Sequence, residues 1–259
     1  MPPSLEIATA EPRLDRLSAL LEGLAPRVRL GAQHDGLSLH IVIDNTGREQ
    51  QNAGLPVPVS ALTLLVCPPG HAPPSDQNVW MSFAVAFNGP VGPLFLAELT
   101  EAMALPLAQA DPSLSQIVQL IAAEMQVQRC GQPFLMERAG DILLIGLLRQ
   151  WVARPASHAG LFKGLADARI AKTLVAMHAK PSEAWTLEAL ALEAGMSRTS
   201  FANQFKRMVQ VSPGKYLETL RMAIARRMVS SGESLKRITE KTGYASPSTL
   251  SRAMSRRRG

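Results

Sequence analysis

Cysteine is scarce in this chain of 259 residues, since Cys67 and Cys130 are the only two. Two cysteines cannot form a disulfide framework or a four-cysteine zinc site. Long hydrophobic runs are also lacking: the longest, Ile142 to Leu148, is far shorter than the roughly 18 residues that a membrane span needs. The first residues contain acids and prolines where a signal peptide has an apolar segment. These absences predict a cytoplasmic protein.

Catalytic motifs are lacking as well, since no Ser-His-Asp set, paired carboxylates or phosphate-binding loop stands out. Cupin enzymes hold a metal through an HxH pair, a carboxylate and a later histidine. The sequence has no HxH, so His40 and His71 are only weak metal candidates, and we expect no enzyme and no cofactor. Whether Cys67 or Cys130 senses redox is open, although Arg129 beside Cys130 would favour a thiolate.

Charge is distributed very unevenly along the chain. Residues 1–160 hold 9 Lys and Arg against 14 Asp and Glu, a net charge of −5. Residues 161–259 hold 18 against 7, a net charge of +11. The first part also contains 16 of the 19 prolines. This asymmetry predicts two domains, of which the basic one meets a polyanion.

Short apolar or alternating runs, split by Gly and Pro, dominate the first part of the chain. They predict a helix within 12–24 and strands at 37–43, 62–67 and 80–87. Strands of this length with frequent turn signals are typical of a small antiparallel barrel or sandwich. Residues 154–166 contain Pro, Gly and Ser and read as a linker.

Helical spacing predicts a hairpin of two helices over 113–128 and 137–152. The second helix is apolar over most of its circumference, so it is buried either inside its domain or against a partner. We expect a homodimer contact on its face formed by Ile142, Ile145, Leu148 and Val152.

A first helix-turn-helix is predicted at about 187–208. Thr186 and Ser197 can each cap a helix, and Gly195 between them suits the left-handed conformation of a sharp turn. The small Ala191 permits close crossing of the two helices, and Phe201 packs the second onto the first. The inward positions of the second helix are Phe201, Phe205 and Met208.

A second helix-turn-helix is predicted at about 235–258. Gly243 marks the turn, Ser246 caps the second helix and Pro247 takes its first position. Ser212-Pro213 opens a long connecting helix between the two units, with Arg221, Arg226 and Arg227 available outside.

Two helix-turn-helix units on one connecting helix resemble the AraC/XylS family of bacterial transcription regulators. The first part of the chain more loosely resembles the cupin-like sensor domains that precede such units. The residues that match the family are Trp185 to Ala191, Ala194 to Ser197, Phe201 to Lys206, Ser212-Pro213, Tyr216-Leu217, Leu220-Arg221, Ala225-Arg226, Ile238, Gly243-Tyr244 and Ser251 to Ala253.

The second unit departs from the family pattern. Thr239 stands where the family usually has Ala, and Leu250 or Met254 stands where it has an aromatic residue. The family also continues past the Gly259 position with a closing helix, so this unit is C-terminally short. We expect it to be the looser unit, and whether it functions is left open.

The resemblance implies an α+β chain of two domains. A β-rich, cupin-like barrel with a helical hairpin forms a sensor and dimerisation domain at 1–153, the linker spans 154–166, and an all-α DNA-binding domain spans 167–259. It further implies a transcription regulator, and an activator in preference to a repressor. Its implied partners are double-stranded DNA, RNA polymerase and a small-molecule effector. The alternatives are a cupin-type metalloenzyme with a basic accessory domain, and a truncated regulator with weak DNA binding.

A recognition helix presents its outward residues to base edges and phosphates. Asn203 can pair with adenine, and Arg252 is suited to guanine. The expected DNA-binding set is Arg198, Thr199, Ala202, Asn203, Lys206, Pro247, Ser248, Ser251 and Arg252.

Overall fold

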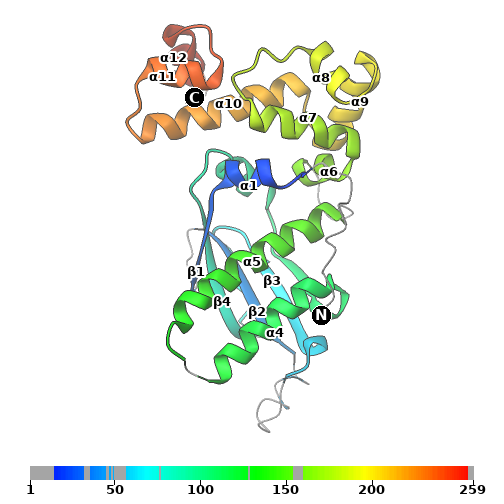
Figure 1. The fold of residues 1–259 in the computed structure, drawn as a ribbon, viewed down its shortest axis with the longest axis vertical. Helices are drawn as coiled ribbons and strands as arrows, with labels where there is room; N and C mark the ends of the chain where they lie inside the picture. The colour runs from blue at the N-terminus through cyan, green and yellow to red at the C-terminus, as the bar shows by residue number, and fades with distance from the viewer. Residues whose placement is uncertain are drawn as a thin grey trace, which may run out of the picture.

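The computed structural model describes residues 15–31, 36–44, 47, 49, 57–75, 77–127, 129–153 and 160–255. Figure 1 shows a sheet with a helical hairpin in the first part of the chain and a layer of helices formed by the second part. Among these residues no helix is both long enough and apolar enough to cross a membrane.

One antiparallel sheet organises the first part of the chain, with strand order β1-β4-β2-β3-β5. Its strands are β1 (Pro26–Leu30), β2 (Leu37–Ile43), β3 (Leu62–Cys67), β4 (Asn78–Phe87) and β5 (Met103–Pro106), with the short 3-10 turns Val59–Ala61 and Leu107–Gln109 nearby. The strands predicted from alternation are confirmed as β2, β3 and most of β4. The short β1 and β5 were not predicted: β1 alternates apolar residues with Arg27 and Arg29 over only five positions, and the four residues of β5 do not alternate.

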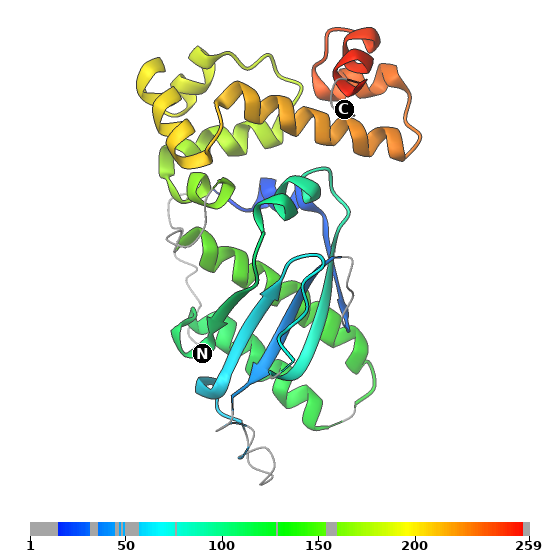
Figure 2. The ribbon, with the colours of Figure 1, turned by 180° about the vertical axis from the view of Figure 1, so that it is seen from behind.

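The predicted helical hairpin is confirmed as α4 (Pro112–Gln126) and α5 (Gln132–Ala153). Asp111 caps α4, since its Oδ1 accepts a hydrogen bond from Ser113 N at 2.9 Å. The hairpin covers one face of the sheet, as Figures 1 and 2 show from opposite sides. A Cβ added at Gly140 would lie 2.6 Å from Val28 Cγ1, so this glycine lets α5 pack closely onto the sheet.

The expected barrel is an open sheet over the residues that the structure describes. Strands β1 and β5 occupy its two edges and do not pair with each other. The apolar face formed by residues such as Leu39 and Phe83 is buried against α5 rather than against a second layer of strands. A helix satisfies its own backbone hydrogen bonds, so it can cover a sheet face without adding strands.

Leu148 is buried in the core, which corrects its predicted place on a dimer face. Leu143, Leu144, Leu147 and Leu148 all have no exposed surface. Ile142 is 49% exposed, and Ile145 and Val152 are partly buried. The helix is apolar nearly all round, so spacing alone could not tell the core side from the outer side.

The second part of the chain is entirely helical over the described residues. It contains α7 (Ala168–Ala179), α8 (Leu187–Glu193), α9 (Arg198–Val209), α10 (Pro213–Ser230), α11 (Leu235–Thr242) and α12 (Pro247–Ser255). Figure 2 shows α10 running the length of this layer and joining its two ends.

Three short helices lie where the sheet meets the helical layer: α1 (Ser18–Leu24), α3 (Gly92–Glu98) and α6 (Leu161–Ala166). Helix α6 falls within the predicted linker 154–166, whose residues 154–159 lie outside the described part. Its Leu161, Phe162 and Leu165 are at most 2% exposed. The end of the predicted linker is therefore a buried helix, because its apolar residues find neighbours on both sides.

The two faces of α5 should respond differently to truncation. Leu148→Ala should lower the free energy of unfolding by about 2–5 kcal/mol, because it leaves a cavity in the core. Leu135→Ala, at an exposed position of α5 outside the hollow between the two helices, is the matched control and should change it by less than about 0.5 kcal/mol. Urea unfolding monitored by circular dichroism measures both, and equal losses would contradict the assignment of the faces.

Candidate DNA interface

The first helix-turn-helix is formed by α8 and α9. Thr186 Oγ1 accepts a hydrogen bond from Ala189 N at 3.1 Å, and Ser197 Oγ accepts one from Ser200 N at 3.3 Å. Gly195, in the turn, has φ +62°, a value that favours glycine. The predicted caps and turn of this unit are confirmed.

The packing of α9 fixes which of its sides faces outward. Phe201 and Phe205 are fully buried, with ring centroids 5.6 Å apart in an edge-to-face arrangement. Phe205 also lies 5.9 Å from the ring of Tyr216 on α10. Ala191 on α8 is 2% exposed at the helix crossing. Two aromatic anchors on one side leave α9 little freedom to rotate.

The outward side of α9 carries the residues expected to meet DNA. Arg198, Thr199, Asn203 and Lys206 are exposed, and Ala202 is half-buried. The guanidinium of Arg198 forms an ion pair with Glu188 at 2.8 Å. Both partners are exposed, and a surface pair of this kind is worth about 1 kcal/mol or less. A phosphate could therefore compete for Arg198 at small cost.

The second helix-turn-helix is formed by α11 and α12. Gly243 turns the chain with φ +68°, and Ser246 Oγ accepts a hydrogen bond from Thr249 N at 3.2 Å. The expected contact residues Pro247, Ser248, Ser251 and Arg252 are all exposed. The basic residues at 256–258 lie outside the described part of the chain.

The two units are packed to very different degrees. The first belongs to the large cluster of buried residues that continues into the sheet domain. The second is held by a separate cluster of Ala225, Ile238 and Leu250, surrounded by partly buried residues that include Met254. Thr239 is accommodated at its small-residue position because its hydroxyl donates to Lys236 O at 2.6 Å.

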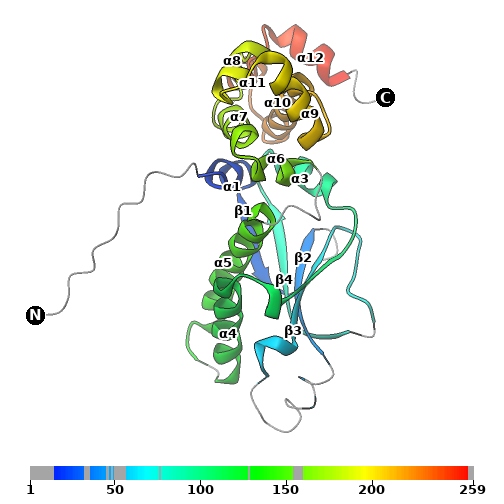
Figure 3. The same ribbon diagram turned by 90° about the vertical axis from the view of Figure 1, so that its right-hand side faces the viewer.

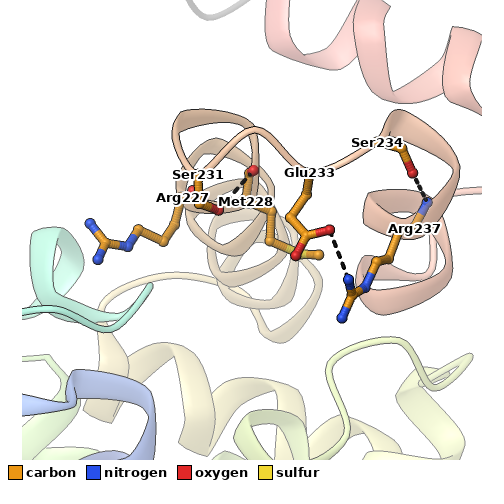
Figure 4. A network of polar contacts seen from close by, with 6 residues as sticks. All are labelled: Arg227, Met228, Ser231, Glu233, Ser234 and Arg237. Atoms are coloured by element: carbon orange, nitrogen blue, oxygen red, sulfur yellow. Dashed lines mark hydrogen bonds and ion pairs between the residues drawn. The ribbon is translucent and has the colours of Figure 1, made fainter.

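The first turn of α11 contains a basic residue outside the predicted DNA-binding set. Figure 4 shows Arg237 paired with Glu233 at 3.0 Å while its backbone N–H donates to Ser234 Oγ. At the end of α10, the Ser231 hydroxyl donates to the carbonyls of Arg227 and Met228. The spacing of Glu233 and Arg237, one helical turn apart, was the available signal for this pair.

Arg221 does not lie free on the outside of α10, contrary to expectation. Its Nε donates to Pro181 O and its guanidinium NH2 to Glu183 O, both at 2.7 Å. A Cβ at Gly243 would lie 2.5 Å from Ser182 O. The loop before α8 therefore packs against both α10 and the turn of the second unit, which ties the two units together.

The candidate metal residues do not form a metal site within the described residues. His40 is buried, with Nδ1 2.7 Å from Ser82 Oγ and Nε2 2.9 Å from Ser38 Oγ. Burial lowers the pKa of His40, which favours the neutral ring. His71 is exposed, and no group of three metal-ligating side chains occurs in this part of the chain.

The two cysteines lie in opposite environments. Cys67 is buried, and burial raises the pKa of its thiol, which opposes the thiolate that a redox sensor needs. Cys130 is exposed beside Arg129. Arg129 in turn lies 3.8 Å from Glu124, so its charge is partly offset.

Comparisons with known proteins agree with this geometry. A family model described as a helix-turn-helix domain matches residues 190–259, and one described as a cupin matches residues 40–153. A putative AraC-like transcription regulator of Streptomyces antibioticus is 33% identical over 138 residues. The chain is therefore similar to AraC-like regulators over its helix-turn-helix part.

Other relatives of this chain are also regulators by name. The HTH-type transcriptional regulator AlkR of Acinetobacter baylyi is 28% identical over 170 residues, covering 60% of this chain and 56% of that protein. The Streptomyces antibioticus match covers 52% of this chain and 46% of that protein. The chain thus spans about half the length of the curated relatives that it matches.

Among solved structures, ToxT from Vibrio cholerae O395 is similar with 12% sequence identity and a TM-score of 0.37. The match covers 89% of this chain and 92% of that one. Likeness of this degree does not bear on function.

The second helix-turn-helix unit should open more readily than the first. Backbone amides of α11 and α12 should exchange with deuterium at least about ten times faster than those of α8 and α9, because only three buried apolar residues form the cluster that holds α11 and α12 within the described residues. Mass spectrometry of peptic fragments gives the rates, and β3 serves as the slow internal reference. Equal protection of both units would contradict the difference in packing.

Proposed function

We propose that this chain is a sequence-specific DNA-binding transcription regulator, and that it acts as an activator which recruits RNA polymerase in response to a small-molecule effector. The outward side of α9 carries the proposal, because a rigidly packed helix presents Asn203, Thr199 and two cations together on the surface of the basic part of the chain. Names of relatives support a regulator rather than an enzyme.

Each outward residue has a role by its chemistry. Asn203 pairs with an adenine, and Thr199 and Ala202 contact a thymine methyl group. Arg198 and Lys206 neutralise phosphates, with Arg198 exchanging Glu188 for DNA. In the second unit Arg252 reads guanine or binds phosphate beside Pro247, Ser248 and Ser251. With α10 as a spacer, the two units enter successive major grooves about 34 Å apart.

The domain boundaries that go with this function are a sensor at 1–153 and a DNA-binding domain at 167–259. Helix α6 lies between them as a packed connection. A metalloenzyme function is not favoured, because both ring nitrogens of His40 are already within hydrogen-bonding distance of serine hydroxyls.

Selection of bound duplexes from random DNA tests the proposal directly. The full chain should enrich one sequence, and its affinity for that duplex should fall steeply with salt because Lys and Arg contacts release condensed counterions. Transcription from a promoter carrying the sequence then separates an activator from a repressor. Failure to enrich any sequence at low salt would refute sequence-specific binding.

Most sequence discrimination should come from the first unit. Asn203→Ala should relax base preference at one position by about 1–3 kcal/mol. Arg252→Ala should lower affinity more uniformly across sequences, because the looser second unit acts mainly through phosphates. Base-by-base competition with the selected duplex measures both, and a larger loss of specificity from Arg252→Ala would reverse the order of the two units.

We also propose that the hairpin of α4 and α5 mediates a homodimer. Its outer side holds a hollow of about 320 Å³ between Ile117 and Leu120 of α4 and Ile142 and Ile145 of α5. Leu120 and Ile142 are about half exposed, and Phe134 is 71% exposed. Apolar side chains gathered in this way on one surface are typical of an interface between subunits.

Ile142→Asp should therefore give a folded monomer at micromolar concentration, because a charge would be buried in the dimer but not in the monomer. Sedimentation velocity measures the oligomeric state, and circular dichroism confirms the fold. Leu235→Asp, at an exposed apolar position on α11, is the matched control and should remain dimeric. A parent chain that is monomeric at these concentrations would rule out the dimer.

A further inference from the structure

Helix α6 is held at both ends by side chains of the sheet domain. At its N-terminus, both carboxylate oxygens of Glu98 accept a hydrogen bond from Leu161 N, at 3.1 and 2.9 Å. At its C-terminus, the guanidinium of Arg16 donates to the carbonyls of Leu165 and Ala166, at 3.2 and 3.1 Å. An anion at the start and a cation at the end match the partial charges of the helix termini.

Glycine at position 160 makes this arrangement possible. Gly160 has φ +73°, and a Cβ there would lie 2.8 Å from the carboxylate atoms of Glu98. Glu98 lies at the last position of α3, so the sheet domain contacts α6 through a side chain that a short helix fixes in place. Removal of its carboxylate from bulk water raises the pKa of Glu98 to about 7, against the opposing effect of the Leu161 hydrogen bond.

Apolar contacts reinforce the two ends. The ring of Phe162 lies edge-on to Phe95 of α3 at 5.5 Å and to Trp151 of α5 at 5.0 Å. Figure 3 shows α6 at the junction, with α3 and α5 on the side of the sheet and α7 and α9 on the other. Displacement of α3 or α5 would therefore displace α6.

The opposite side of α6 packs against the first helix-turn-helix without a gap. A Cβ at Gly164 would come within 2.8 Å of Leu174 on α7 and 2.9 Å of Val209 on α9. Directly after α6, one oxygen of Asp167 caps α7 by accepting from Arg169 N and Ile170 N. Its other oxygen accepts a hydrogen bond from Gln204 Nε2 at 2.8 Å. Gln204 is the neighbour of Asn203 on α9.

We propose that α6 couples the sheet domain to the recognition helix α9. Glu98 and Arg16 hold α6 in place on the sheet domain, and the hydrogen bond between Asp167 and Gln204 links the end of α6 to α9. Asp167 and Gln204 are positioning residues, since they act through the orientation of Asn203 and its neighbours. The effect of this coupling on DNA binding rests on the proposed function. The chain of contacts from Glu98 to α9 does not depend on DNA.

Hydrogen exchange on the full chain tests the link itself. At pH 8, where Glu98 is mostly ionised, Glu98→Ala should speed amide exchange about five-fold or more in α6 and in α9, while β3 and α12 keep their rates. Glu101→Ala is the matched control, and Arg16→Ala should reproduce the effect from the other end of α6. A change confined to α6 would overturn the coupling, as would a uniform change across the whole chain.

A double-mutant cycle on DNA binding tests what the link does. Glu98→Ala and Gln204→Ala should each weaken binding of the selected duplex about five-fold, and the double variant should be little weaker than either alone. Asp167→Ser can still cap α7 through its hydroxyl but has no second oxygen to accept from Gln204, so it should match Gln204→Ala in affinity without lowering the melting temperature of the chain. Independent, multiplicative losses would overturn the coupling. If no duplex is bound by the parent chain, the proposed function fails while hydrogen exchange still decides the link.

Discussion

The burial of α6 between the sheet domain and the first helix-turn-helix is the contact on which the rest of the arrangement depends. One hydrophobic cluster runs from the sheet through Phe95, Phe162 and Leu165 to Phe205 on the recognition helix. Packed interiors rearrange between discrete arrangements rather than deforming continuously. A change in the packing of the sheet domain would therefore alter the position of α9, because the buried residues between them are in continuous contact. Helix α9 carries the surface that is proposed to contact DNA.

The two helix-turn-helix units differ in what supports them. The first is anchored to the main core, whereas the second depends on Ala225, Ile238 and Leu250 and on its contact with the loop before α8. That contact is specific, since Arg221 donates to two carbonyls of the loop and Gly243 approaches Ser182 O closely. The position of the second unit is thus set largely by polar contacts, and its interior contributes little.

The sheet domain combines a buried apolar interior with an exposed apolar side on its hairpin. Both faces of β2 are buried, and the polar His40 is accommodated there because Ser38 and Ser82 lie within hydrogen-bonding distance of its ring nitrogens. The hairpin directs Leu148 inward and Ile142 outward on one helix. One helix therefore provides both the core of this domain and the surface that we assign to the dimer.

The sequence by itself determined the local features whose signals are local. Alternation located β2, β3 and most of β4, and Thr186, Gly195, Ser197 and Ser246 marked caps and turns, because each such residue acts on a backbone group a few positions away. It also placed Asn203 and Lys206 on the outward side of α9. Only the tertiary structure decided that the strands form an open sheet, that Leu148 faces the core, that Arg221 binds a loop and that part of the expected linker is the buried α6. Each of these depends on which distant segment lies opposite. The sequence of a helix that is apolar all round does not specify which segment packs against it, and neither does a short apolar segment beside glycine and proline. Packing against segments that are far away in the chain decides it.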